Sequence, residues 1–145
     1  MKKRFCFLML MIIAIACSDD NSINNNASEI ANIVKSGTWR ITYFFDTDSD
    51  ETSNFAGYAF TFGSSDVLTA TKGGTTYLGT WSISDSNSND DSIDDLEFNI
   101  AFVAPPDFEE LSEDWDMIEY TTTRIKLVHV SGGNGGTDYL TFEKN

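Results

Sequence analysis

The chain has 145 residues, of which 41% are hydrophobic and 13% aromatic, and it carries a formal net charge of −14. This length and apolar content are sufficient for one packed domain, which excludes disorder for most of the chain. The small number of Lys and Arg residues excludes nucleic-acid binding and a polybasic membrane-surface site, because both need cations to neutralise phosphates or anionic headgroups.

The N-terminus has the three-part arrangement of a secretory signal. Lys2, Lys3 and Arg4 precede an apolar run over residues 5–16, and the sequence then changes abruptly to polar residues. A helix of twelve residues is roughly 18 Å long, well short of the ~30 Å hydrocarbon core, so this run does not predict a permanent transmembrane helix. Residues 1–16 are therefore expected to be a cleaved signal peptide.

The residues that follow determine where the mature chain is expected to reside. Residues 14–17 (AIAC) resemble the lipobox of bacterial lipoproteins, which implies that Cys17 is lipidated and anchors the chain in a membrane. Residues 17–27 are then expected to form a flexible tether. Residues 18–20 (SDD) resemble an acidic signal that exports lipoproteins to the outer face of the outer membrane. The alternatives are an ordinary signal peptide that leaves a free Cys17 thiol, and an Asp pair that only prevents inner-membrane retention.

A short helix is expected before the first strand. Asn26 and Glu29 have the spacing of a capping box, and Ile30 and Val34 share one helical face. Gly37 is suited to end this helix, because glycine readily adopts the left-handed conformation found at helix C-termini.

From Thr38 onward the hydrophobic period changes to two, with turn residues at short intervals. This pattern predicts eight strands, over residues 38–45, 57–62, 67–71, 75–84, 96–103, 116–121, 124–130 and 139–143. One helical turn is expected within residues 107–114. Short, evenly spaced strands predict an all-β meander, and closing it into an eight-stranded antiparallel up-and-down barrel removes the exposed edges. A β-sandwich is the alternative.

A family resemblance supports the barrel. Residues 37–39 (GTW) follow a short helix and resemble the G-x-W signature of lipocalins, and the later stretch 111–144 is similar to small lipocalin-like lipoproteins of surface-exporting bacteria. The resemblance covers residues 28–145 and implies that they form a lipocalin-like domain. It also implies that Gly37 and Trp39 belong to the closed end of the barrel, under the helix, and that Arg124 stacks on Trp39 through a cation–π contact.

The predicted strands place many bulky side chains on their inward faces. Candidate ligand-binding residues, at a barrel mouth near residues 46–54 and 85–95, are Tyr43, Tyr58, Tyr77, Trp81 and Phe98. Trp39, Phe60 and Phe102 are also expected to point inward. The alternative is that all of these aromatics pack a solid core and leave no room for a ligand.

The acidic loops offer a weak candidate metal site. Asp46, Asp48 and Asp50 alternate as in a calcium loop, but the Gly and Glu positions of the EF-hand pattern are not filled. Residues 85–91 are similarly rich in oxygen ligands, and solvated hairpin loops are the alternative in both cases. His129 is the single His, which is too few for a zinc site with three or four nitrogen or sulfur ligands. No cofactor is expected.

Catalysis is not expected. The chain has no G-x-S-x-G motif, and its acid pairs at 94–95 and 109–110, which a glycosidase would need, are common in so acidic a sequence. We expect a monomeric lipoprotein, anchored in the outer membrane and exposed at the cell surface, that binds a small apolar molecule or glycan at the barrel mouth. The alternative is a structural or interaction lipoprotein with a solid core that contacts another envelope protein.

Overall fold

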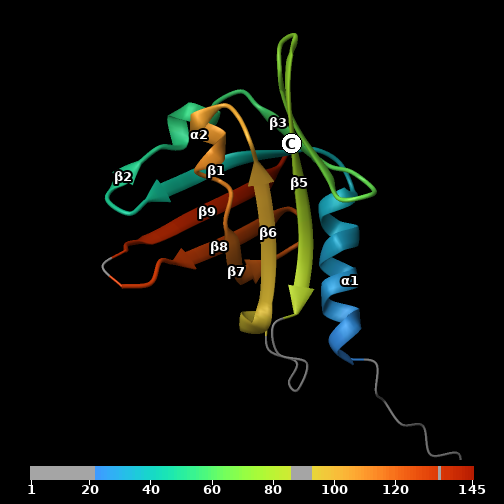
Figure 1. The fold of residues 1–145 in the computed structure, drawn as a ribbon. Helices are drawn as coiled ribbons and strands as arrows, with labels where there is room; N and C mark the ends of the chain where they lie inside the picture. The colour runs from blue at the N-terminus through green and yellow to red at the C-terminus, as the bar shows by residue number, and fades with distance from the viewer. Residues whose placement is uncertain (1–21, 86–92, 134) are drawn as a thin grey trace, which may run out of the picture.

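The computed structural model (Figure 1) describes residues 22–85, 93–133 and 135–145. The predicted signal peptide, Cys17 and residues 18–20 lie outside the described residues, as do residues 86–92 of the second acidic loop. In chain order the elements are α1 (Ser22–Lys35), β1 (Trp39–Asp46), β2 (Ser49–Asp50), η1 (Thr52–Phe55), β3 (Ala59–Phe62), β4 (Val67–Lys72), β5 (Thr75–Asp85), η2 (Ile93–Asp95), β6 (Leu96–Phe102), α2 (Pro106–Glu109), β7 (Asp114–Tyr120), β8 (Arg124–Val130) and β9 (Thr137–Lys144).

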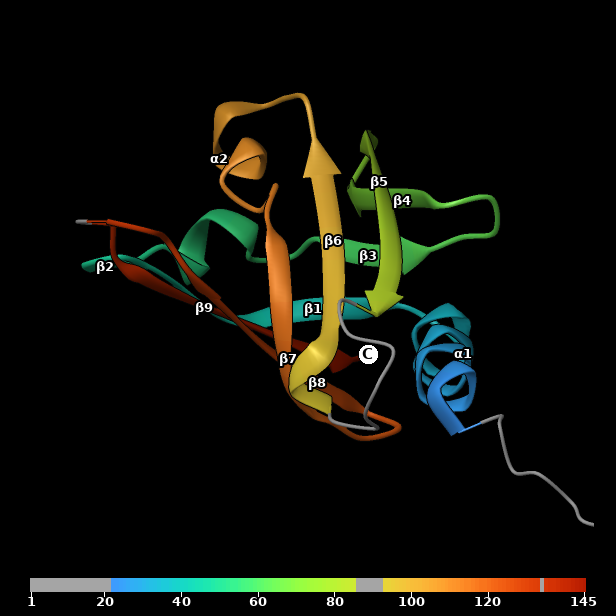
Figure 2. The same ribbon diagram turned by 60° about the horizontal axis from the view of Figure 1, so that its bottom comes forward.

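The strands close into a barrel. Each strand from β3 to β8 pairs antiparallel with the next one in the chain, and β1 pairs with both β3 and β9. Trp39 lies opposite Lys144 and Phe45 opposite Tyr139, so the first and last strands are joined along most of their length. Figure 1 and Figure 2, two views turned by 60°, both show β6 crossing in front of β1. The predicted eight-stranded antiparallel barrel is confirmed, and the alternative β-sandwich is wrong.

A β-bulge interrupts the alternation of β1. Ile41 lies opposite Phe142, but the next paired residue is Tyr43, so that Thr42 is an extra residue in this strand. The extra residue reverses the inward and outward order that follows it: Phe44 is buried, whereas Tyr43 is 40% exposed. The prediction that Tyr43 points inward is therefore wrong, because a strict period of two does not anticipate a bulge.

Aromatic side chains fill the barrel interior. The inward-pointing aromatics that were predicted and are buried are Trp39, Phe60, Trp81, Phe98 and Phe102. Phe62 lies among them, and its ring meets those of Trp81 and Phe98 edge to face, at centroid distances of 5.4 and 5.5 Å. This geometry places the positive edge of one ring against the negative face of another, which stabilises the pair beyond the burial of area.

Helix α1 packs against β5 and β3 and begins earlier than predicted. Ile30 and Val34 are fully buried, as expected for its apolar face. The helix starts at Ser22, ahead of Asn26, so part of the predicted tether over residues 17–27 is helical. Ser and Asn cost only a few tenths of a kcal/mol each in a helix, and a helix held by packing can extend through such residues. The described helices are all too short or too polar to span a membrane.

Candidate functional site

Trp39 and helix α1 close one end of the barrel. Gly37 has a φ of +108°, a conformation that favours glycine, and it turns the chain from α1 into β1. The Trp39 side chain is fully buried, and its indole N–H donates a hydrogen bond to the Val34 carbonyl oxygen at 2.8 Å. A buried indole N–H needs such a partner. This bond therefore fixes the end of the helix against the first strand.

The cation beside Trp39 is Lys144. Its Nζ lies 5.1 Å from the centre of the Trp39 ring and donates a hydrogen bond to the Ser36 hydroxyl at 2.9 Å. The β1–β9 register explains this contact, because it places Lys144 directly opposite Trp39. Arg124 instead pairs with Glu119 at 2.9 Å on the outer surface. The prediction that Arg124 stacks on Trp39 is therefore wrong.

Phe108 lies at the barrel end that carries residues 46–54, where its ring contacts Phe55. β1 and β5 run in opposite directions, so Asp46 and Asp85 end their strands at opposite ends of the barrel, and the prediction of one mouth near residues 46–54 and 85–95 is wrong.

Phe108 lies on α2, which begins at Pro106, a residue suited to the first turn of a helix. The Phe108 side chain is only 2% exposed, and its ring centre lies 5.0 Å from the rings of both Tyr58 and Tyr77. A further contact at 5.1 Å joins it to Phe102. A ligand entering the interior here would have to displace the Phe108 ring.

The structure separates the five candidate ligand-binding residues. Tyr43 lies on the outer face, whereas Tyr58 and Tyr77 are partly buried beside Phe108, with their rings 5.9 Å apart. Trp81 and Phe98 are stacked inside the core at 6.0 Å, and the Trp81 indole N–H donates to the Gly63 carbonyl oxygen. Four of the five therefore contribute to packing, and the predicted common pocket is not formed by them.

The first acidic loop is a tight hairpin between β1 and β2. Asp46 lies opposite Ser49 in that hairpin. Burial and the nearby charge of Asp138 raise the pKa of Asp46, whereas hydrogen bonds from Thr52 lower the pKa of Asp50. The carboxylates of Asp46 and Asp50 thus have different surroundings, and Asp48 is exposed. In the part of the chain that the structure describes, the converging set of possible metal ligands lies elsewhere.

That set is Glu113, Asp114 and His129, at the start of β7 and near the end of β8. One ligand atom from each residue lies within 4.8 Å of the others. The His129 side chain is 18% exposed, and its Nε2 is 3.5 Å from a Glu113 carboxylate oxygen. The number of His residues in the sequence does not indicate this group, because its other two members are acidic. The signal was the predicted pairing of residues 116–121 with 124–130, which brings His129 back to the start of β7.

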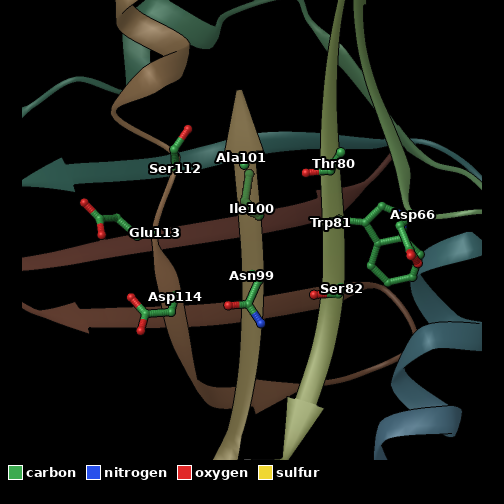
Figure 3. Close-up of a pocket in the computed structure, with 10 residues that line it drawn as sticks. All are labelled: Asp66, Thr80, Trp81, Ser82, Asn99, Ile100, Ala101, Ser112, Glu113 and Asp114. Carbon is green, nitrogen blue, oxygen red and sulfur yellow. The ribbon is translucent and has the colours of Figure 1, made fainter. Parts of the chain in front are cut away.

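An open hollow of about 510 Å³ lies on the outer face of β5, β6 and β7 and reaches this group (Figure 3). Hydroxyl, amide and carboxylate groups line much of it, including those of Thr80, Ser82, Asn99, Ser112, Glu113 and Asp114. Figure 3 shows Glu113 and Asp114 on one side of β6 and Trp81 on the other side of β5. The hollow lies outside the barrel wall, away from the interior that was predicted to hold a ligand.

The structure describes only part of the two acid pairs that were considered for a glycosidase. The Asp94 side chain lies outside the described residues, and Glu109 and Glu110 are both exposed at the end of α2. A glycosidase needs two carboxylates that face one another across a bound sugar. Glu109 and Glu110 are instead exposed to solvent, as most charged surface residues are.

No protein-family model matches the chain, and no curated protein matches it. Among solved structures, a DUF4847 family protein from Bacteroides vulgatus is similar at 17% identity and a TM-score of 0.48, covering 80% of this chain and 97% of the other.

Proposed function

We propose that this chain is a monomeric lipoprotein, anchored in the outer membrane through Cys17, whose solid barrel has no catalytic role and contacts another protein of the cell envelope. The anchor and the address rest on the N-terminal residues: the apolar run, the AIAC motif ending at Cys17 and the acidic residues that follow it. Two acyl chains on one residue provide stable membrane anchoring, where one chain gives only marginal binding.

The observation that carries the choice of a solid barrel is the filling of its interior. Trp39 and α1 cover one end, and Phe108 lies within van der Waals reach of the aromatic rings at the other. Lipocalin-like ligand carriers need an interior volume of some hundreds of Å³, whereas here the inward positions hold closely spaced rings. This packing favours an interaction protein over a carrier of apolar molecules.

The anchor is tested by mass spectrometry of the mature N-terminus. We expect the chain to begin at Cys17 with added acyl groups, and Cys17→Ser to abolish both the mass increase and the membrane fraction. Cys6→Ser is the matched control, because Cys6 lies in the signal peptide and its replacement should leave anchoring unchanged. Protease treatment of intact cells then tests the surface address, and the double variant Asp19→Asn/Asp20→Asn should reduce access of the protease. Recovery of an unmodified Cys17 in the wild-type chain would reject the anchor.

The solid core is tested by a thermal-shift screen of the intact chain against fatty acids and soluble sugars. We expect Tm to stay unchanged with all of them, because no ligand can bind inside without displacing Phe108. Phe108→Ala should open a cavity that apolar molecules can fill, as large-to-small core substitutions do. A rise in the Tm of the wild-type chain with any of these ligands would instead favour the binding function at the barrel.

A further inference from the structure

We propose that Glu113, Asp114 and His129 form a binding site for a divalent first-row transition-metal ion, with Zn²⁺ as the reference ion. This inference is independent of the proposed interaction function, because it rests on three side chains at the barrel rim. The ligand atoms come from two neighbouring strands, β7 with the residue before it, and β8, so the fold holds them in place.

The separation of the two best-placed ligand atoms suits a shared ion. Zinc lies about 2.0–2.2 Å from imidazole nitrogen and carboxylate oxygen, so two such ligands at a tetrahedral angle are roughly 3.4 Å apart. The distance from His129 Nε2 to Glu113 Oε2 is 3.5 Å. Asp114 Oδ1 lies 3.8 Å from the other ring nitrogen of His129, Nδ1. The Asp114 side chain is 64% exposed, and its carboxylate must turn from Nδ1 toward Nε2 to share the ion.

The imidazole is oriented by contacts that a metal ligand requires. His129 Nδ1 lies 3.1 Å from the Asp114 backbone carbonyl oxygen, which can only accept a hydrogen bond. In neutral His129 the proton is therefore on Nδ1, and the lone pair of Nε2 faces Glu113. Metal-binding His residues commonly have this arrangement, in which the second ring nitrogen donates to a carbonyl or carboxylate. The Trp115 ring packs against the imidazole edge to face at 6.1 Å and limits its rotation.

The ligand types indicate which ions bind. Imidazole nitrogen favours Zn²⁺, Co²⁺, Ni²⁺ and Cu²⁺, whereas Ca²⁺ and Mg²⁺ prefer sites made only of oxygen. Three protein ligands leave a fourth position for water, and the hollow of Figure 3 leads to two of the ligands, Glu113 and Asp114. The net charge of −14 attracts cations to the surface as a whole.

The test uses the intact chain without a histidine tag, titrated with Zn²⁺. His129 is the single His of the sequence, so its ring-nitrogen NMR signals need no assignment. We expect saturable binding of one ion per chain, a large shift of the Nε2 signal, and Nδ1 remaining protonated. Excess Ca²⁺ should not displace the ion. Co²⁺ should bind at the same site and quench part of the tryptophan fluorescence, because Trp115 contacts the imidazole.

Matched variants separate this site from general attraction to an acidic surface. His129→Gln and Glu113→Gln should each weaken Zn²⁺ binding by at least about tenfold, since the loss of even an outer-sphere partner costs 10–100-fold. Asp116→Asn is the control: it removes one exposed carboxylate from the same strand, outside the ligand set, and should leave the affinity unchanged. Thermal melts confirm that the variants are folded. The proposal would be overturned if His129→Gln had unchanged Zn²⁺ affinity, or if the imidazole signals moved only on protonation. His129 would then be only an ion-pair partner of Glu113.

Discussion

Gly79 shows at the scale of a single residue how closely β5 and β6 pack. A Cβ at this position would lie 2.5 Å from the Ala101 carbonyl oxygen and 2.8 Å from a ring carbon of Phe102. Neither neighbour can move freely, because the carbonyl belongs to the β5–β6 pairing and the Phe102 ring is buried. Glycine is required here by the space available.

Gly79→Ala is expected to lower the free energy of unfolding by about 1–3 kcal/mol, the usual cost of overpacking a filled site. Urea denaturation measures this change. Gly74→Ala is the matched control, because nothing lies within 4 Å of a Cβ added in that turn. If the Gly79 variant were as stable as the control, β5 and β6 could not approach as closely as described.

Asp46 gives a prediction of pH dependence. Burial and the charge of Asp138 raise the pKa of Asp46 in the folded protein. The protonated form thus stabilises the fold below the ordinary Asp pKa of about 3.9, and this contribution is lost as the pH rises through the folded value. Asp46→Asn should therefore have a higher Tm than the wild type at pH 7, with the difference shrinking below about pH 4.

Asp48→Asn is the control for Asp46→Asn, because it removes a charge from an exposed position of the same hairpin. Melting curves recorded across the pH range compare the two variants. A lower Tm for Asp46→Asn at pH 7 would mean that its carboxylate, in the charged form, contributes favourably to the fold.

At the scale of elements, the bulge in β1 determines which side chains enter the core. Phe44→Ala is expected to cost about 3–5 kcal/mol, since the ring is 1% exposed and contacts Phe55 and Trp115. Tyr43→Ala should cost far less, because this residue lies on the outer face. Chemical denaturation of both variants checks the order, and a reversed order would place Tyr43 inside and remove the bulge.

The strands could be predicted from the sequence because alternation and turn residues act locally. The eight expected strands are all present, with bounds shifted by a few residues at β3, β7 and β9. The bulge at Thr42 could not be predicted, since it depends on how β1 meets β9. The same holds for the contact of Lys144 with Trp39 and for the role of Phe108, which depend on tertiary packing rather than on spacing.

At the scale of the whole molecule, closure of the barrel can be measured by hydrogen exchange. The amides paired between β1 and β9 should exchange as slowly as those between β5 and β6, because both pairs lie within one continuous ring. An open sheet would instead leave β1 and β9 as fraying edges. Fast exchange at Ile41 and Phe142, with slow exchange at Trp81 and Ile100, would contradict closure.

The shape of the molecule could be predicted more fully than its site. Closure followed from a physical requirement, the avoidance of free edges, that applies to any sheet of this size. The expected ligand pocket did not follow from any such requirement. Strand patterns show which side chains point inward, but they do not show whether these side chains leave space between them. The group around His129 needed the three-dimensional register as well, since its members are separated by the length of a hairpin.

A closed ring also limits how other chains can attach to this one. Each of its eight strands has a neighbour on both sides, and among the described strands only β2, with two residues, is paired on one side. So short a segment is a poor template for strand addition by a peptide or for growth of a fibril. Association with this barrel therefore depends on its outward side chains and loops, which can change by substitution while the backbone stays the same.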